Sequence, residues 1–302
     1  MTTGNTTWGG SVVEADDGSF HMYAALMSKN GTLGTWLEQS QIAHAVSKPG
    51  SPQGPYTFSD VAIDGRGGSH WDAVTCHNPD VIRTPEGLYV IYYMGSGSGE
   101  FGQRVGMAWS ESPYGPWTRS AGPIIPPGPA GKWDDGFTCN PAASVYANGT
   151  VLLIYKARSR EHSKQMLEGV AVARQWNASY VKLTPDTPLD LPTNCEDAGI
   201  YRASTSEGDI YRMLTHCGCA GQYMWSKDGV HWSRTTPPQG WCADIPFTDG
   251  TNGSVSTRQR PKWLVKKEGG GVATHVFTGV NRPGDSPMGH TWTMAAALEM
   301  PP

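Results

Sequence analysis

The residues of this sequence that are best suited to chemistry lie at the starts of short strand-like segments, in the stretches that lead into them, or at and just after the ends of the apolar segments that follow. Carboxylates there can donate or accept protons, guanidinium groups can bind carboxylate or sulfate groups through two hydrogen bonds, and tryptophan rings can stack on a ligand. The carboxylates are Glu196, Asp135, Asp134, Glu161 and Asp72. The other candidates are Trp8, His77, Asn78, Asn140, Arg160, His162, His216 and Arg260. Residues so far apart in the sequence can act together only where the fold brings their segments to one place.

An apolar segment of strand length occurs five times, bounded by Gly, Asp or Asn, at 20–26, 88–95, 150–157, 210–217 and 273–280. A strand-like segment precedes each, at 9–15, 78–83, 140–146, 196–202 and 260–266. A segment of small residues follows each, at 42–47, 105–110, 169–173, 222–226 and 291–297. Repeated units of three or four antiparallel strands are typical of propeller blades.

The repeat therefore predicts an all-β fold, a five-bladed β-propeller that forms a single domain over residues 1–302. Its blades should start near residues 9, 78, 140, 196 and 260. The alternative is a β-sandwich with accidental internal similarity.

In such a propeller the first strand of each blade is innermost, and neighbouring strands alternate in direction. The start of the first strand, the loop between the second and third strands, and the loop leading into each blade then share one face. The candidates named above fall at these places, so we expect a polar hub with a rim of tryptophans on that face.

The composition argues against several partners. A net charge of −4 gives no basic patch for a nucleic acid, and no apolar run approaches the ~18 residues that cross a membrane. The candidate histidines lie on separate loops without the local spacing of a metal site. We therefore expect a monomer with no metal and no other cofactor.

Six cysteines and five N-x-[ST] sequons, at Asn5, Asn30, Asn148, Asn177 and Asn252, favour an oxidising compartment. We expect a secreted glycoprotein whose leader has been removed, since Met1-Thr2-Thr3-Gly4 does not look like a signal peptide. Cys76 and Cys139 occupy equivalent strand starts in neighbouring blades, which makes them a candidate disulfide pair. A cytosolic protein with free thiols is the alternative.

Four stretches give the chain a family resemblance: HNPDVIR-x-PEGLYVIYY at 77–93, S-x-SP-x-GPW at 110–117, NCEDAGIYR at 194–202 and SKDGVHW at 226–232. With the blade starts aligned, nearly the whole chain resembles the five-bladed propeller glycoside hydrolases of the arabinanase and β-xylosidase type. It is most similar to a eukaryotic branch in which E-D opens blade four and R-P opens blade five.

The resemblance implies a carbohydrate substrate and three carboxylates at the hub: a base opening blade one, a pKa-tuning Asp opening blade three and a general acid Glu opening blade four. The acid carries over onto Glu196. Blade one instead opens with Trp8-Gly9-Gly10-Ser11, and blade three opens with Asn140-Pro141. Hydrolysis of a glycoside needs a second group beside the acid, for which Asp135 is favoured, followed by Asp134 and Glu161.

Three functions remain open at this point. The first is an exo-acting glycosidase that removes a terminal sugar from an oligosaccharide or polysaccharide, with Asp72, the histidines and Arg160 binding substrate. The second is a carbohydrate-binding propeller that does not catalyse hydrolysis. The third is a lyase or a histidine-dependent glycosidase that uses His77 or His162. Arg260 either binds an acidic substrate group or pairs with Glu196, and pairing would favour the ionised form of Glu196.

Overall fold

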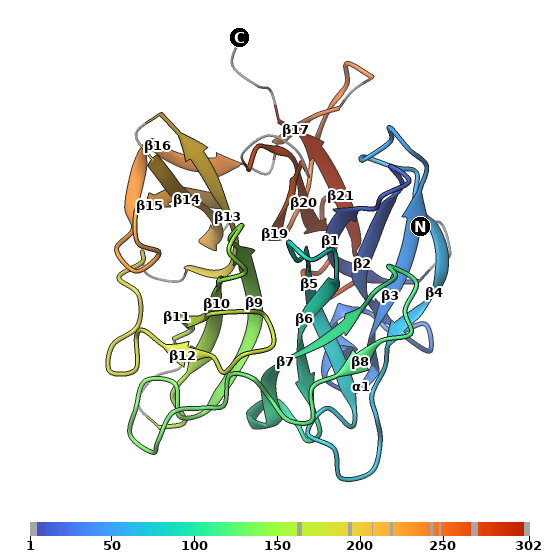
Figure 1. Ribbon diagram of the computed structural model, residues 1–302. Coiled ribbons are helices and arrows are strands. Elements are labelled where there is room, and N and C mark those ends of the chain that lie inside the picture. The colour runs from blue at the N-terminus through green and yellow to red at the C-terminus, as the bar shows by residue number, and fades with distance from the viewer. Residues whose placement is uncertain are drawn as a thin grey trace.

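The fold is seen in a computed structural model that describes residues 5–161, 165–192, 195–206, 208–217, 220–241, 244–247, 249–266 and 271–298. Five antiparallel sheets form the blades of a β-propeller, as predicted, and their first strands lie around its middle (Figure 1). Blade one consists of β1 (Thr7–Glu14), β2 (Phe20–Met27), β3 (Ser40–Ser47) and β4 (Thr57–Ile63). Blade two consists of β5 (Thr75–Arg83), β6 (Tyr89–Ser96), β7 (Gln103–Ser110) and β8 (Thr118–Arg119).

The remaining blades follow the same order from the innermost strand outward. Blade three consists of β9 (Phe137–Val145), β10 (Val151–Arg158), β11 (Leu167–Ala173) and β12 (Val181–Lys182). Blade four consists of β13 (Cys195–Thr205), β14 (Gly208–Cys217), β15 (Ala220–Ser226) and β16 (Ser233–Trp241). Blade five consists of β19 (Arg258–Val265), β20 (Ala273–Val280) and β21 (Trp292–Ala297), after a small hairpin of β17 (Asp244–Pro246) and β18 (Asn252–Ser254).

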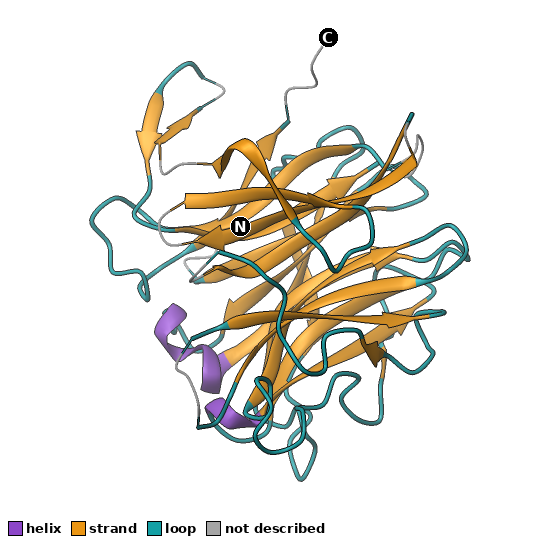
Figure 2. Cartoon of the chain, turned by 90° about the vertical axis from the view of Figure 1, so that its left-hand side faces the viewer, coloured by secondary structure: helices purple, strands orange, loops and turns teal. Residues whose placement is uncertain are grey.

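The helical segments are short and belong to loops. They are η1 (Leu33–Thr35) and α1 (Trp36–Gln39) between β2 and β3, and η2 (Glu100–Gly102) between β6 and β7. Figure 2 shows them together at one end of the blades. Because they join second strands to third strands, this is the face on which the innermost strands start. Over the described part of the chain, no helix has the length and apolarity needed to cross a bilayer.

Apolar clusters fill the spaces between neighbouring blades. Ile91 packs with Ile42 between blades two and one, Leu153 with Val90 between three and two, and Ile200 with Ile154 between four and three. Trp241 packs with Val276 between blades four and five. Leu264 and Phe277 of blade five pack with Val12 and Met22 of blade one. Thr7 and Thr291 are joined by hydrogen bonds, so side-chain packing and hydrogen bonds both close the ring. Burial of apolar surface on both faces of each sheet explains why the second strands are almost continuously apolar.

The cysteines contradict the predicted Cys76–Cys139 pair, but they do include a disulfide, as expected. Cys195 is bonded to Cys217 across the β13–β14 ladder, directly beside Glu196. The predicted Cys76–Cys139 pair is wrong, because both are free thiols that lie in different apolar clusters, Cys76 against blade one and Cys139 with Met94 and Phe137. Cys219 and Cys242 lie outside the described residues.

Alkylation of the unfolded, non-reduced protein should therefore label Cys76 and Cys139 and leave Cys195 and Cys217 unlabelled, as read by peptide mass spectrometry. In the folded protein Cys76 and Cys139 should also resist labelling. Burial removes them from solvent and raises the pKa of the Cys139 thiol to about 12, which suppresses the reactive thiolate. A peptide that links Cys76 to Cys139 would contradict this arrangement.

A chain of polar contacts crosses blade one. Ser19 Oγ lies 2.9 Å from His21 Nε2, His21 Nδ1 lies 2.8 Å from His44 Nε2, and His44 Nδ1 lies 3.1 Å from Asp60 Oδ2. Both rings are fully buried, and Tyr114 from blade two packs edge-on against them. Burial first, and then His44, lower the pKa of His21 to about 4, and burial lowers the pKa of His44.

The free energy of unfolding should therefore fall as the pH is lowered from about 6.5 towards 4. In this range the histidines bind protons in the unfolded chain but stay neutral in the folded protein. Between pH 6.5 and 5 the loss should reach about 2 kcal/mol from His21, at about 1.4 kcal/mol per pH unit. Urea unfolding of a His21→Asn/His44→Gln variant should show a flatter pH dependence than the wild type. The exposed His231→Asn variant serves as the control and should keep the wild-type slope. Equal slopes for the double variant and the wild type would refute the assignment.

Candidate active site

The innermost strands share one backbone irregularity near their starts. Each ladder with the second strand shifts register there, and one residue takes a positive φ. These residues are Gly9, Asn78, Asn140, Asp197 and Arg260, with φ of 57°, 51°, 49°, 64° and 58°. Gly, Asn and Asp tolerate this conformation, whereas Arg260 is strained in it. A bulge of this kind redirects side chains and breaks the alternation of a strand.

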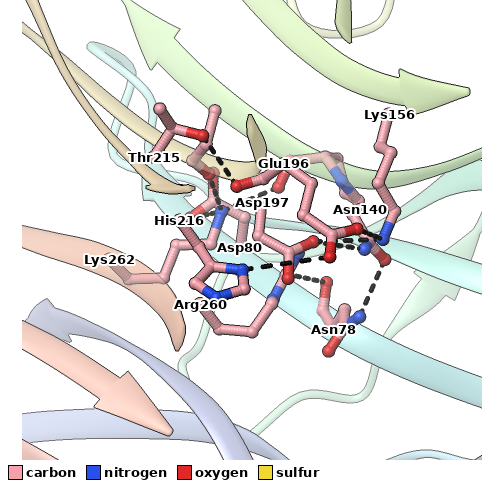
Figure 3. Close-up of polar contacts among 12 residues, drawn as sticks. Asn78, Asp80, Asn140, Lys156, Glu196, Asp197, Thr215, His216, Arg260 and Lys262 are labelled. Atoms are coloured by element: carbon pink, nitrogen blue, oxygen red, sulfur yellow. Dashed lines mark hydrogen bonds and ion pairs between the residues drawn. The ribbon is translucent and has the colours of Figure 1, made fainter. Parts of the chain in front are cut away.

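The register corrects the predicted start of blade four. Asp197, and not Glu196, occupies the position equivalent to Asn78 and Asn140. The prediction assumed strict alternation along the strand, which would turn Asp197 away from the hub. Because of the bulge, both Glu196 and Asp197 reach the site (Figure 3).

Four of the equivalent residues form a buried polar ring. Asn78 Nδ2 donates to Asn140 Oδ1 at 2.7 Å, and Asn140 Nδ2 donates to Asp197 Oδ1 at 2.5 Å. Arg260 Nη1 donates to Asp197 Oδ1 at 3.2 Å, and Nη2 donates to the Asn78 carbonyl at 3.3 Å. The fifth position is Gly9, where a Cβ would lie 3.1 Å from Arg260 Cβ. Glycine there leaves room for the arginine.

Glu196 lies on the exposed side of this ring. Its Oε2 accepts a hydrogen bond from Lys156 Nζ at 2.7 Å, and its Oε1 lies 3.8 Å from His216 Nδ1. The Glu196 side chain is 28% exposed, against 12% for Lys156 and 9% for His216. His216 Nδ1 is buried without a hydrogen-bond partner among the described residues. Glu196 is thus a reachable carboxylate backed by buried polar groups.

Two cations set the charge of the site. Lys156 Nζ also lies 3.4 Å from Asp197 Oδ1, so the lysine bridges both carboxylates. Burial disfavours a charged Asp197, but Lys156 and Arg260 outweigh it and hold the pKa of Asp197 well below its usual range. Burial likewise disfavours a charged Lys156, but Asp197 and Glu196 keep its pKa above the ordinary lysine value. The buried Asp197 carboxylate is therefore balanced by two protein cations, Lys156 and Arg260.

Glu196, Asp197 and His216 also offer three ligand atoms within 4.8 Å of one another. A metal ion there would have to displace Lys156 from Glu196 and compete with Arg260 for Asp197. The residues present thus neutralise the carboxylates with protein cations, which fits a metal site poorly.

A second polar layer closes the hub beneath the ring. Lys262 Nζ from blade five donates to the Pro141 carbonyl at 2.7 Å and lies 3.2 Å from Asp80 Oδ1, so it crosses the hub. Asp80 also accepts hydrogen bonds from Ser11 and from the Ala143 amide. Beyond this layer, a cavity of 560 Å³ opens at the far ends of the innermost strands, with Asp80 and Lys262 among its lining residues. A ligand that contacts Glu196 therefore approaches from the face of the strand starts.

Two of the predicted site acids, Asp134 and Asp72, bind side chains of their own blades. Asp134 is buried, accepts a hydrogen bond from Tyr155 and pairs with Lys182 at 2.5 Å. Asp72 is fully buried, accepts a hydrogen bond from Tyr93 at 2.7 Å and pairs with Arg66 and Arg119. Trp71 and Trp133, which precede these acids, stack on Tyr93 and Tyr155. This repeated arrangement of Trp-Asp against Tyr holds the outer strands of blades two and three.

The predicted loop residues make contacts within and between their loops. Both carboxylate oxygens of Asp135 accept backbone amide hydrogens, from Gly131 and Arg160, each at 2.7 Å. Arg160 is exposed with its guanidinium 4.7 Å from the Phe101 ring centroid, and Glu161 is exposed at the end of the described loop. His162 lies outside the described residues.

Trp8 and His77 belong to the packed interior. Trp8 is buried against Gly279 and with Met27 and Leu33, so it has no face free for a sugar. His77 Nδ1 lies 2.7 Å from Ser40 Oγ, and the ring stacks on Trp36. Burial and then Arg260 lower the pKa of His77 to about 3, which keeps it neutral.

The sequence-based reasoning missed Lys156 and Glu168 and misjudged Asp197. The signal for Asp197 was present: Asn78, Asn140 and Arg260 all precede a proline, and Asp197 precedes Ala198 at the same place. For Lys156 and Glu168 the signal is a pair of opposite charges at facing positions of the blade-three hairpin, with Lys156 inside the predicted segment 150–157 and Glu168 directly before the predicted segment 169–173.

Comparisons with known proteins indicate the class of protein to which this fold corresponds. By sequence, no family model and no curated protein matches the chain. By structure, it is similar to the family 117 glycoside hydrolase Zg3597 of the marine bacterium Zobellia galactanivorans, with a TM-score of 0.68 and 19% identity over 96% of this chain and 84% of that one. It is also similar to the α-L-arabinofuranosidase PaAbf62A of Podospora anserina, with a TM-score of 0.62 and 11% identity over 99% and 93% of the two chains.

A third similar structure is a family 43 β-xylosidase/α-arabinofuranosidase from a compost microbial metagenome, with a TM-score of 0.62 and 14% identity over 98% and 92% of the two chains. The chain therefore has the five-bladed propeller fold of these glycoside hydrolases, and the fold implied by the sequence resemblance is confirmed.

Proposed function

We propose that this protein is a secreted, exo-acting glycoside hydrolase that removes a terminal sugar at the hub, with Glu196 as the reacting carboxyl. The observation that carries the proposal is the partly exposed Glu196 carboxylate, held by Lys156 and adjacent to His216 on the open side of the ring. The similar structures that act on arabinosides and xylosides make a carbohydrate the most suitable substrate class. The layer of Asp80 and Lys262 gives the site a closed floor, which suits a chain end better than the middle of a polymer.

The contact with Lys156 changes the role expected for Glu196. The ammonium group of Lys156 lies 2.7 Å from Glu196 Oε2 and faces an oxygen on which a general acid could carry its proton, so this contact favours a role for Glu196 as base or nucleophile. An ionised carboxylate can activate water or attack the anomeric carbon, whereas a general acid must first hold a proton. His216, whose Nδ1 is 3.8 Å from Glu196 Oε1, is the neighbouring group that can exchange a proton with it.

A carbohydrate-binding propeller without turnover is the second candidate. The buried ring favours it, because Asn78, Asn140, Asp197 and Arg260 already bind one another. Asp197 is also too deeply buried to serve as a second reacting carboxylate.

The two candidates are separated by a screen of the purified protein. Nitrophenyl glycosides and plant or algal oligosaccharides should be tested in parallel for hydrolysis and for binding by calorimetry. Release of single sugar units from chain ends supports the proposed hydrolase. Binding without release over long incubation, with the wild type and Glu196→Gln binding alike, would replace it with the binding propeller.

A further inference from the structure

Glu168 is a buried carboxyl next to the site that the proposed mechanism does not use. It lies on β11, where it pairs directly with Lys156 on β10, and it is 2% exposed. Both of its carboxyl oxygens are buried without a hydrogen-bond partner among the described residues. Burying such a group is unfavourable, so its presence beside Lys156 calls for a physical reason.

The pairing of β10 with β11 shows to which face of the sheet the Glu168 side chain points. Directly paired residues of antiparallel strands point to the same face, so Glu168 and Lys156 share the face that carries Ile154 and Val170. That face packs against Ala198 and Ile200 of blade four. Glu168 thus lies between blades three and four, beside the lysine that reaches across to Glu196 and Asp197.

The charged groups around Glu168 come from several elements. Lys156 is on β10, Glu196 and Asp197 are on β13, and Arg260 is on β19. The segment after β12, which bonds to the Glu168 backbone through Leu189, adds the exposed Asp186 and Asp190. Burial first, and then Asp197, raise the pKa of Glu168 to about 8, while Lys156 and Arg260 act in the opposite direction.

With Glu168 neutral, the cluster contains two carboxylates, Glu196 and Asp197, and two cations, Lys156 and Arg260. If Glu168 were also ionised, one negative charge would have no matching cation. The cation that faces Glu168 on the neighbouring strand is Lys156. We propose that Glu168 is a positioning residue for the Glu196–Lys156 pair: as a neutral carboxyl it leaves the ammonium to Glu196, and once ionised it competes for that ammonium. The proton lost on ionisation goes to solvent. This inference rests on the proposed function for its kinetic readout only.

A measurement without substrate tests the inference first. Infrared difference spectra between pH 5 and 10 should contain a carboxylic-acid C=O band that disappears around pH 8 in the wild type. The band should be absent from Glu168→Gln, whose amide has the same shape and cannot ionise, and present in Asp190→Asn, a matched change on the exposed neighbouring segment. Absence of the band in the wild type at pH 6, or its survival in Glu168→Gln, overturns the proposal.

The second readout is the pH profile of turnover. Above pH 8 the wild type and Asp190→Asn should lose about tenfold per pH unit as Glu196 loses its partner, whereas Glu168→Gln should change by less than about twofold. The same alkaline limb in Glu168→Gln as in the wild type overturns a positioning role. If Glu168→Gln does not fold, the presence or absence of the carboxylic-acid band in the wild type decides whether the proposal stands. If no glycoside is cleaved, the proposed function fails while the infrared result still stands.

Discussion

Replacing Glu196 by glutamine should lower turnover by about 10²–10⁴-fold, the range expected for loss of a proton-transferring group. The amide keeps the size of the side chain but can neither take up a proton nor attack carbon. Because Lys156 Nζ hydrogen-bonds to Glu196 Oε2, we expect Glu196 to act as base or nucleophile, and the loss should then be similar for glycosides with good and poor leaving groups. Steady-state kinetics on a nitrophenyl glycoside and on an oligosaccharide of the same sugar measures this.

The matched control is Glu86→Gln, an exposed glutamate in the hairpin between β5 and β6 on the opposite face, which should keep wild-type rates. A loss confined to poor leaving groups would instead assign Glu196 as the general acid implied by the sequence resemblance. An unchanged rate with every substrate would remove Glu196 from the mechanism altogether.

Replacing Asp197 by asparagine should destabilise the fold by about 3–5 kcal/mol, the cost of breaking one side of a buried ion pair. The variant keeps the side-chain volume but removes the anion that faces the fully buried Arg260 guanidinium. It also deprives Lys156 of one of its two carboxylates. Urea unfolding followed by tryptophan fluorescence gives the change in the free energy of unfolding.

Asp209→Asn is the control for this substitution. It makes the same chemical change in an ion pair with Arg202 that is partly exposed, and exposed pairs contribute about 0–1 kcal/mol. A loss below about 1 kcal/mol in Asp197→Asn would show that the buried ring does not hold the hub together.

The sequence by itself determined the architecture, because the fold depends on a pattern that repeats. Five apolar segments, each between a strand-like segment and a small-residue segment, correspond to the second strands of five blades. The blade starts expected near 9, 78, 140, 196 and 260 lie within the innermost strands, which begin at Thr7, Thr75, Phe137, Cys195 and Arg258. Local periodicity is enough to predict the propeller, since each blade buries the same two faces against its neighbours.

The tertiary structure decided which side chains meet at the hub. A bulge at Asp197 broke the alternation on which the sequence-based assignment depended, and it brought two adjacent carboxylates to one site. Lys156 comes from the second strand of the neighbouring blade, so no spacing along the chain connects it to Glu196. Cys76 and Cys139 occupy equivalent positions yet lie in different interblade clusters. Contacts between blades depend on the relative rotation of whole sheets, which a one-dimensional repeat does not encode.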